Sequence, residues 1–413
     1  MDMSLTEVIE CEVCGAINMR SLLNLGDHPM CDDLVPLGDP RICKEFPIEI
    51  LFCDVCKTAN QRFQVPKETL FPKTYHYRSR LTGDVLSGMS DFVEKTEKMF
   101  GNLAGKLVLD VGCNDGSLLS LFTQRGAKTI GVEPTNAADD ALSVGHKIYK
   151  DYFDENFVKK FKLNHGFPDI ITFTNVFAHI ERFDLLLKAL KELMGDRTLL
   201  IVENHYLGSV LKQNQFDTFY HEHPRTYSVT SFLHIAETLG ISVTGLNFPE
   251  RYGGNIRVFM GNGTYFNETQ DKIMQEALLP EENFSEDFLK LNQNISLWQS
   301  KKRKQIYDLH QKYGLLYAKA FPGRAAILVK LLEIDETVFG GVFEKPDSPK
   351  IGNFVPGTRI PILSDNKMME LMKPGQPLIN FAWHIPNEIY RYLDELGFRE
   401  NVINIVDSED FQN

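Results

Sequence analysis

Strands and helices are predicted to alternate through the middle of the chain. Compact apolar runs predict strands, and apolar residues at helical spacing predict helices. The expected strands are Lys106–Val111, Thr129–Glu133, Ile170–Thr174 and Thr198–Glu203. The expected helices are Val85–Phe100, Ser117–Arg125, Phe183–Met194 and Ser231–Leu239. Nearly continuous apolar strands separated by helices are typical of a parallel sheet that is covered on both faces.

A smaller pattern of the same kind follows a charged helix expected at Glu281–Lys304. Beyond this helix we expect strands at Ala325–Leu331 and Pro377–Trp383, and helices at Lys367–Met372 and Pro386–Leu396. The sequence therefore predicts a further α/β unit near the C-terminus.

Cysteines are concentrated at the start of the chain. Four of them form two Cys-x-x-Cys pairs, Cys11/Cys14 and Cys53/Cys56. Each pair can turn both of its sulfur atoms towards one metal ion, and two pairs make the four-thiolate set that suits Zn²⁺. Because all four coordination positions would be filled, we expect one structural zinc per chain and no zinc catalysis.

Other uses of these thiols remain open. A redox Cys-x-x-Cys pair normally stands at a helix start after a strand, and this fits two pairs in a small segment poorly. Four free thiols are the simplest alternative. The remaining early cysteines, Cys31 and Cys43, are expected to be small buried apolar residues.

Length and charge narrow the class of protein. The chain has 413 residues, which favours two or three domains over a single core. Its formal charge of −12 argues against nonspecific binding to nucleic acid or to an anionic membrane. We find no apolar run of bilayer length and no signal-peptide pattern at the N-terminus. We therefore expect a soluble, cytoplasmic protein with no nucleic-acid or membrane partner.

A glycine loop follows the first strand of the middle region. It contains two glycines that allow the backbone to approach a ligand closely. The helix expected from Ser117 adds free N–H groups. The loop reads Asp110-Val111-Gly112-Cys113-Asn114-Asp115-Gly116. This pattern lacks the second glycine of a dinucleotide-binding loop, and it resembles the first motif of class I S-adenosylmethionine (SAM) methyltransferases.

Residues after the later strands fit the same cofactor. Glu133, followed by Pro134, ends the second strand and can accept both ribose hydroxyls. Asp151 starts a short segment that can face the adenine, and Asn175 ends a strand where it would border the methyl group. The alternative is a nucleotide-binding Rossmann domain that uses a nicotinamide cofactor. We predict SAM binding, with Asn114, Asp115 and the loop glycines Gly112 and Gly116 among the contacts.

Four ionisable residues stand side by side at Tyr220-His221-Glu222-His223, after Gln215-Phe216-Asp217. In an extended chain, Tyr220 and Glu222 point one way and the two histidines the other. A loop at a sheet edge can aim several of these groups at one substrate. An ordinary polar surface loop and a second metal site are the alternatives.

Taken together, these motifs resemble the three-domain, zinc-containing sugar C-methyltransferases. The zinc cysteines, the glycine loop, the Tyr-His-Glu-His run, Gly253-Gly254 and Arg257 carry the resemblance, as does Asn353-Phe354-Val355-Pro356-Gly357. It implies an α/β fold with a central class I SAM methyltransferase domain, Rossmann-like, between a small zinc-binding domain and a C-terminal α/β domain. The expected boundaries are 1–80, 81–265 and 266–413.

The resemblance also implies a reaction and a substrate. The family methylates the carbon beside the ketone of a nucleotide-linked 4-keto-6-deoxy sugar, usually at C3, and we expect a dTDP sugar and a monomeric enzyme. The reaction needs a base and donors to the enolate oxygen. Following the family pattern, His223 is the expected base, Glu222 orients it, and His179 is a second candidate. The expected donors to the sugar are Tyr220 and either Tyr75 or Tyr77.

Two other functions remain as alternatives. One is SAM-dependent O- or N-methylation of a sugar or small metabolite, which needs no enolate. The other is a noncatalytic, zinc-stabilised binding protein that keeps the fold.

Overall fold

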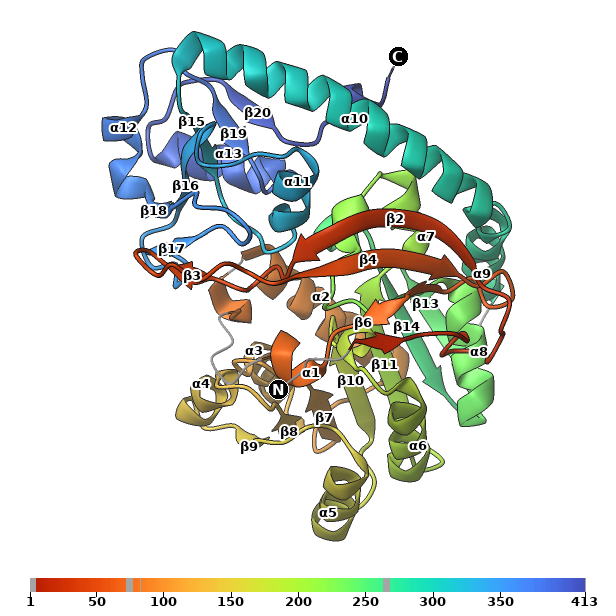
Figure 1. The fold of residues 1–413 in the computed structure, drawn as a ribbon. Coiled ribbons are helices and arrows are strands. Elements are labelled where there is room, and N and C mark those ends of the chain that lie inside the picture. The colour runs from red at the N-terminus through yellow and green to blue at the C-terminus, as the bar shows by residue number, and fades with distance from the viewer. Residues whose placement is uncertain (1–4, 72–76, 82, 263–267, 413) are drawn as a thin grey trace. The chain divides into compact units, whose positions relative to one another are not determined.

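The computed structural model describes residues 5–71, 77–81, 83–262 and 268–412 (Figure 1). The chain divides into two compact units, each built from three segments. Unit 1 contains Met1–Ser21, Leu51–Val210 and Glu222–Ser285. Unit 2 contains Leu22–Ile50, Leu211–His221 and Glu286–Asn413. None of the described helices is both long enough and apolar enough to cross a membrane.

The main sheet of unit 1 has seven strands in the order β13-β14-β11-β10-β7-β8-β9. These are β7 (Leu107–Val111), β8 (Lys128–Val132), β9 (Lys147–Tyr149), β10 (Ile170–Thr174), β11 (Leu199–His205), β13 (Ser242–Asn247) and β14 (Asn255–Gly261). The strands from β11 to β9 are parallel, as predicted from their apolar runs. Strand β14 is antiparallel to both β11 and β13, an edge arrangement that the sequence pattern did not predict.

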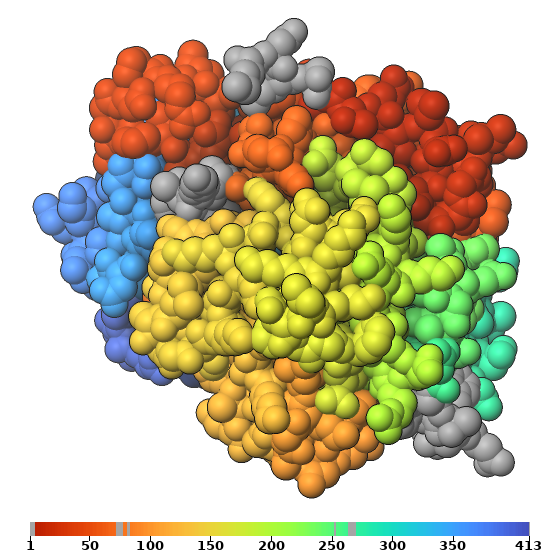
Figure 2. Space-filling model, turned by 90° about the horizontal axis from the view of Figure 1, so that it is seen from below, coloured from red at the N-terminus to blue at the C-terminus, as the bar shows by residue number. Residues whose placement is uncertain are grey.

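Helices cover both faces of this sheet. They are α2 (Gly83–Phe100), α3 (Ser117–Gln124), α4 (Ala137–Ser143), α5 (Glu155–His165), α6 (Phe183–Leu193), α7 (Leu207–Lys212), α8 (Val229–Leu239) and α9 (Glu268–Glu281). Phe92 of α2 and Phe122 of α3 pack with Val108 of β7 in one buried cluster. Phe173 of β10 meets Phe153 and Phe177. Figure 2 views unit 1 from the side of α5, which lies within the yellow surface.

The cysteine-containing part of unit 1 is built from short strands. β1 (Thr6–Glu7) pairs with β6 (Phe63–Gln64), and β5 (Ala59–Gln61) pairs with β12 (Arg225–Thr226), in both cases antiparallel. The single-turn helix α1 (Lys67–Leu70) follows β6. Through β12, a segment that follows the Tyr-His-Glu-His run is fixed directly beside the cysteine turns.

Unit 2 contains a parallel five-stranded sheet in the order β18-β16-β15-β19-β20. Its strands are β15 (Leu316–Lys319), β16 (Phe339–Glu344), β18 (Ile362–Ser364), β19 (Leu378–Asn380) and β20 (Val402–Asn404). Its helices are α10 (Phe284–Tyr313, which begins at the end of unit 1), α11 (Ala325–Leu331), α12 (Met368–Leu371) and α13 (Pro386–Glu395). The predicted C-terminal α/β unit is therefore present.

The chain between the two cysteine pairs forms strands of unit 2. β2 (Arg20–Pro29) and β4 (Glu45–Phe52) are neighbours in a sheet, and the two-residue β3 (Val35–Pro36) pairs with β17 (Asn353–Phe354). The long gap between the cysteine pairs is thus filled by a structured insertion, whose chain returns to unit 1 at Leu51.

One predicted element is wrong. Ala325–Leu331 was expected to be a strand and forms helix α11. Residues from Ala325 to Val329 in this run are all buried, so no polar face marks a helical period. A short apolar run that is buried on every side has the same pattern in a strand and in a helix. The strands of unit 2 on either side of α11, β15 and β16, were missed.

Candidate active site and metal centre

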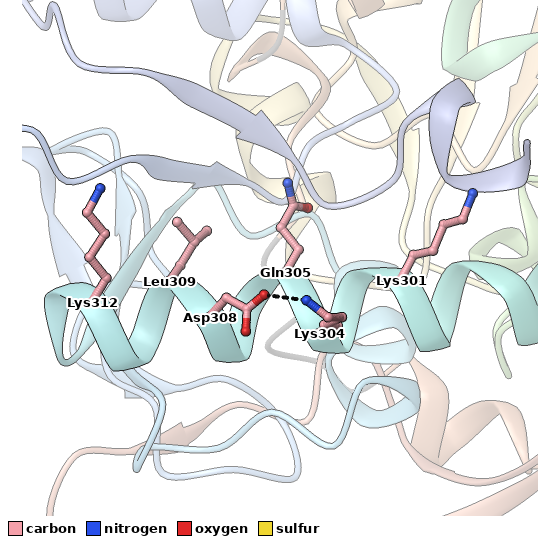
Figure 3. A pocket seen from close by; sticks show the side chains of 6 residues that line it. All are labelled: Lys301, Lys304, Gln305, Asp308, Leu309 and Lys312. Atoms are coloured by element: carbon pink, nitrogen blue, oxygen red, sulfur yellow. Dashed lines mark hydrogen bonds and ion pairs between the residues drawn. The ribbon is translucent and has the colours of Figure 1, made fainter.

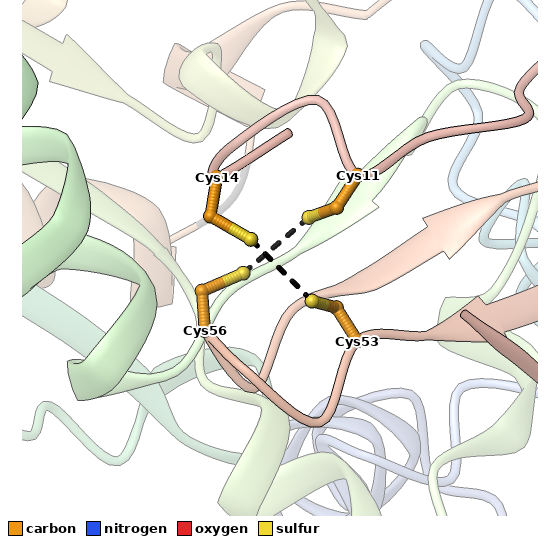
Figure 4. A group of neighbouring side chains, drawn as sticks. All are labelled: Cys11, Cys14, Cys53 and Cys56. Carbon is orange, nitrogen blue, oxygen red and sulfur yellow. Dashed lines mark hydrogen bonds between the residues drawn. The ribbon is translucent and has the colours of Figure 1, made fainter. Parts of the chain in front are cut away.

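Four sulfur atoms face one another in unit 1 (Figure 4). The sulfurs of Cys11 and Cys56 are 3.4 Å apart, those of Cys14 and Cys53 are 3.5 Å apart, and all four lie within 4.8 Å of one another. Thiolates bound to one Zn²⁺ at about 2.3 Å in a tetrahedron are about 3.8 Å apart. The predicted ligand set is therefore brought together at the spacing of a closed structural zinc site.

The four thiols cannot all ionise by themselves. Hydrogen bonding to Cys53 raises the pKa of Cys11 to about 12, and the contact with Cys11 raises the pKa of Cys56. Hydrogen bonds from Cys11 and Cys56 lower the pKa of Cys53 to about 2. The cluster thus stabilises one thiolate at the expense of the others. A divalent cation would remove this repulsion, so the donor chemistry fits zinc.

The cysteine cluster is tied to helix α8. The carbonyl of Cys56 accepts hydrogen bonds from the hydroxyls of Ser228 and Ser231, at 3.3 and 3.1 Å. The hydroxyl of Thr58 lies 2.7 Å from that of Ser231 and 3.0 Å from the sulfur of Cys56. Ser228 and Ser231 also form the capping box of α8. The groups that cap this helix therefore hold the second cysteine turn as well.

A buried arginine holds the first cysteine turn. Arg225 lies in β12 and donates to Glu12, which stands between Cys11 and Cys14, at 2.5 Å. The guanidinium also donates to the hydroxyl of Tyr227 at 3.1 Å and to the carbonyl of Ile180. Sequence reasoning missed Arg225, because nothing in its neighbourhood along the chain marks it as a partner of Glu12.

The glycine loop connects β7 to α3 and needs its glycines. Gly112 has φ +69°, and a Cβ there would lie 2.5 Å from a methyl group of Val176. Gly116 has φ +79°, and its Cβ would lie 2.6 Å from the ring of His146. The loop backbone is therefore packed closely against Val176, which follows β10, and against His146, which precedes β9. The two glycines are thus required by contacts within the protein itself.

Two buried carboxylates flank the loop. Asp110 accepts a hydrogen bond from Thr172 at 2.7 Å, and burial, followed by the nearby charge of Glu133, raises its pKa to about 7. Glu133 accepts from the backbone N–H of Asn114 at 3.1 Å and from the hydroxyl of Thr135 at 2.6 Å. Two acidic groups held together in a buried place favour a cationic ligand, such as the sulfonium and amino groups of SAM.

The segment from Tyr77 to Arg80 lies along the loop. Asn114 donates to the carbonyl of Tyr77 at 3.2 Å and accepts from the N–H of Ser79 at 3.1 Å. Asp115 accepts from the N–H of Arg80 at 2.9 Å and from the hydroxyl of Ser117 at 2.6 Å. The side chains of Asn114 and Asp115 thus bind the chain's own backbone. Tyr77 is 39% exposed.

The remaining predicted cofactor residues are spread along the same sheet edge. Pro134 is half-buried after Glu133, whereas Asp151 is exposed and accepts a local bond from the backbone N–H of Tyr152. Burial and the charges of Glu68 and Glu133 raise the pKa of Tyr152. The predicted tyrosine Tyr75 lies outside the described residues.

Asn175 is the end of a buried polar network. It has φ +54°, and its side-chain oxygen accepts from Asn255 at 3.3 Å. Asn255 also donates to Glu203 at 3.0 Å, and Glu203 accepts from Arg257 at 2.7 Å. The side chains of Glu203 and Arg257 are fully buried. Arg257, noted from its motif, therefore acts on Asn175 through Glu203 and Asn255, two residues that sequence reasoning missed.

Three histidine rings meet near the ends of β10 and β11. The ring centre of His223 lies 4.9 Å from that of His179 and 5.1 Å from that of His205. Nδ1 of His179 is 2.6 Å from the carbonyl oxygen of Glu222, and burial lowers the pKa of His179 to about 4. His223 and Glu222 are each 5% exposed. The two histidines predicted as base candidates are brought together. His205, which the sequence did not indicate, lies beside them.

The other half of the Tyr-His-Glu-His run belongs to unit 2. Nε2 of His221 is 3.0 Å from the carbonyl of Phe46, burial lowers the pKa of His221 to about 4, and Tyr220 is half-buried. Upstream, Asp217 accepts from Arg324 at 2.8 Å and from the indole of Trp383 at 2.9 Å. The Gln-Phe-Asp motif is therefore fixed within unit 2 by the hydrogen bonds of Asp217, and Arg324 is its charged partner.

An open pocket of about 430 Å³ lies on helix α10 (Figure 3). It is lined by Lys301, Lys304, Gln305, Asp308, Leu309 and Lys312. Lys304 pairs with Asp308 at 2.8 Å, and Lys301 donates to the carbonyl of Gln412. These lysines bind the chain's own groups, and the pocket holds none of the predicted site residues.

Three protein-family models match the chain one after another. Residues 11–71 match a putative zinc binding domain, residues 77–245 a methyltransferase domain, and residues 250–403 a C-methyltransferase C-terminal domain. The matches follow the order expected from the motifs.

Two curated proteins and one solved structure illustrate the similarity. The C-methyltransferase NovU of Streptomyces niveus is 29% identical over 402 residues, which cover 95% of this chain and 93% of NovU. An uncharacterised protein of Haemophilus influenzae is 28% identical over 142 residues, covering 31% of this chain and 54% of that protein. A magnesium protoporphyrin IX methyltransferase (ChlM) from Synechocystis, solved with bound SAM, is 17% identical, with a TM-score of 0.33, and covers 44% of this chain and 82% of its own.

Proposed function

Because the chain belongs to the three-domain, SAM-dependent C-methyltransferases, we propose that its substrate is a nucleotide-linked 4-keto-6-deoxy sugar. The methyl group would go to the carbon beside the ketone, C3, and the nucleotide would be dTDP. The observation that carries this proposal is the contact of His223 with His179, because an imidazole has an unperturbed pKa near physiological pH and can take a proton from carbon. We place the three domains at 1–80, 81–265 and 266–413, in a monomeric cytoplasmic enzyme.

The glycine loop is the proposed SAM site. SAM supplies an electrophilic methyl group when it is bound. Gly112 and Gly116 let the loop pack closely against Val176 and His146, and Glu133 would accept the ribose hydroxyls with Pro134 beside it. Asp110, Asn114 and Asp115 shape the loop around the amino-acid part, and the segment that starts at Asp151 would border the adenine. Asn175 would stand next to the methyl group.

The histidine site lies next to this loop. Val176, which touches Gly112, belongs to the turn that ends at His179, and His179 contacts His223. This short chain of contacts supports a base close to the methyl donor. Glu222 would orient His223, and Tyr220 with Tyr75 or Tyr77 would donate hydrogen bonds to the sugar. The enolate oxygen needs such donors as it gains charge.

Proton exchange in D₂O tests the proposal. The enzyme is incubated with a dTDP-4-keto-6-deoxy sugar without SAM, and deuterium at C3 is followed by mass spectrometry. We expect deuterium to enter C3, and a C-methylated product to form once SAM is added. Methylation of a hydroxyl or amine without any exchange at carbon would overturn the C3 proposal and favour O- or N-methylation.

A further inference from the structure

The ring of His205 extends the two predicted histidines into a row of three. It is the last residue of β11, where Asn255 of β14 stands opposite it. His223 lies between His179 and His205, with ring centres 4.9 and 5.1 Å away. His223 is only 5% exposed, whereas both outer rings, His179 and His205, are half-buried. Exposure therefore does not choose between the two outer rings, and the bonding of His179 decides between them.

The proposed function creates a need for such a route, and this inference rests on it. The C3–H bond breaks, and the proton goes to His223. The electron pair of the enolate forms the new C–C bond with the methyl group, while the S–CH₃ bond breaks and leaves its pair on sulfur. One positive charge is lost from the sulfonium and one proton is gained by the base. His223 must therefore release a proton to solvent in every turnover.

His179 is poorly placed to take this proton. Its Nδ1 is engaged at 2.6 Å by the carbonyl of Glu222, which requires the N–H at that atom. Burial lowers the pKa of His179 to about 4, so a second proton on its ring is unfavourable near neutral pH. The nearest acid on β11, Glu203, is fully buried, and Arg257 and Asn255 already bond its oxygens.

We propose that His205 is a proton-relay residue that accepts the proton from the buried base His223 and passes it to water. It acts through His223 and does not need to touch the sugar. An imidazole suits this step because its unperturbed pKa lies near physiological pH. His205 would therefore limit how fast the base is regenerated, rather than how well the enzyme binds SAM or transfers the methyl group.

Two rates measured on one protein separate a relay from a structural role. The first is deuterium entry at C3 of a dTDP-4-keto-6-deoxy sugar in D₂O without SAM. The second is methyl transfer in a single turnover with excess enzyme. Without the relay, the abstracted proton stays on His223 and returns to the same carbon. In His205→Asn and His205→Gln we expect about tenfold slower deuterium entry, with single-turnover methylation within about threefold of the wild type.

The controls keep the proposal falsifiable. His234→Gln removes an imidazole from helix α8 and should change neither rate, and free imidazole should restore deuterium entry in His205→Asn. SAM affinity and zinc content report correct folding of each variant. Unchanged deuterium entry in both His205 variants, or equal loss of both rates without rescue, would overturn the relay. Absence of exchange and of methylated product in the wild type would instead overturn the proposed function itself.

Discussion

The guanidinium of Arg225 is fully buried and donates to the carboxylate of Glu12 inside the first cysteine turn. A second arginine, Arg20, pairs with Asp54 inside the other cysteine turn, but both of these side chains are about half exposed. Both pairs join an arginine to a carboxylate within a cysteine turn, but their surroundings are opposite. They allow the stability contributed by a buried ion pair and by an exposed one beside the metal centre to be compared within one protein.

Breaking the buried pair should therefore lower the free energy of unfolding far more than breaking the exposed pair. Arg225→Met removes the charged partner of Glu12, whose side chain is 20% exposed and keeps its bond from Gln64, and we expect the free energy of unfolding to fall by about 3–5 kcal/mol. Arg20→Gln should cost at most about 1 kcal/mol, because water replaces an exposed partner. Urea denaturation of the zinc-loaded proteins measures both. An equal fall in the free energy of unfolding in the two variants would show that the burial of Arg225 does not determine the stability of its ion pair.

Zinc content should depend on the four clustered cysteines. Purified protein should contain about one zinc per chain, and Cys53→Ser or Cys11→Ser should lose the metal and destabilise the fold, since binding and folding are linked. Cys43→Ser is the matched control, because Cys43 donates to the carbonyl of Asp33 and lies outside the cluster. Metal analysis by mass spectrometry and thermal melting give the readouts. Active wild-type protein that contains no zinc would contradict this prediction.

The carboxylate of Glu133 should contribute to SAM affinity. Glu133→Ala removes charged hydrogen bonds, and we expect binding to weaken by about 1.5–3 kcal/mol, or roughly tenfold to a hundredfold. Asp139→Ala removes an exposed carboxylate from helix α4 and should leave the affinity unchanged. Isothermal titration calorimetry compares the two. Wild-type affinity in Glu133→Ala would place the ribose elsewhere.

SAM binding should strengthen as the pH rises through neutrality. Burial raises the pKa of Asp110 to about 7 in the free protein, so at pH 6 most of it is protonated. A cationic ligand favours the ionised form, and at pH 6 the proton must first leave. We expect roughly tenfold weaker binding at pH 6 than at pH 8.

The variant Asp110→Asn isolates this effect from the titration of SAM itself. Its affinity should be lower and should lack the rise between pH 6 and pH 8.

The effect of Asp110 on the free energy of unfolding changes with pH in the opposite direction. The folded-state pKa lies above the unfolded value, so the contribution of Asp110 to the stability of the free protein is complete below about pH 4. This contribution is lost as the pH rises through about 7. The free energy of unfolding of Asp110→Asn should lack that decrease. The same pH profile in wild type and Asp110→Asn would exclude Asp110 as its source.

His223 should be needed for proton removal rather than for binding. His223→Asn should lower turnover by about 10²–10⁴ and suppress deuterium entry at C3, while SAM and sugar binding stay nearly intact. His221→Asn is the control within the same run, because His221 bonds the carbonyl of Phe46 in unit 2. If His223→Asn exchanges the C3 proton normally and only methylation fails, His179 becomes the leading candidate for the base.

The sequence predicted those features that depend on local pattern. The strand Ile170–Thr174 and the helix start at Ser117 agree with β10 and α3, and the cysteine spacing anticipated the cluster. These features follow from periodicity, from glycine geometry and from ligand spacing, which a few consecutive residues determine.

Features that depend on contacts between distant segments could not be predicted. His205 ends a strand whose sequence gives no sign of catalysis, and only the fold brings it to His223, which lies 18 residues further on in the sequence. The partnership of Arg324 with Asp217 spans 107 residues. The Tyr-His-Glu-His run looked like one cluster, whereas the two compact units divide between His221 and Glu222.

The pairing of β5 with β12 has a consequence for the synthesis of the protein. All four thiols emerge from the ribosome before Ala59, but Arg225 and Ser228, which hold their turns, are made about 170 residues later. At about 5–20 residues per second, this delay is roughly 10–30 s. During that time the nascent thiols have neither their buried arginine nor the helix cap. Rapid capture of the metal would protect them from oxidation until the rest of the support is translated.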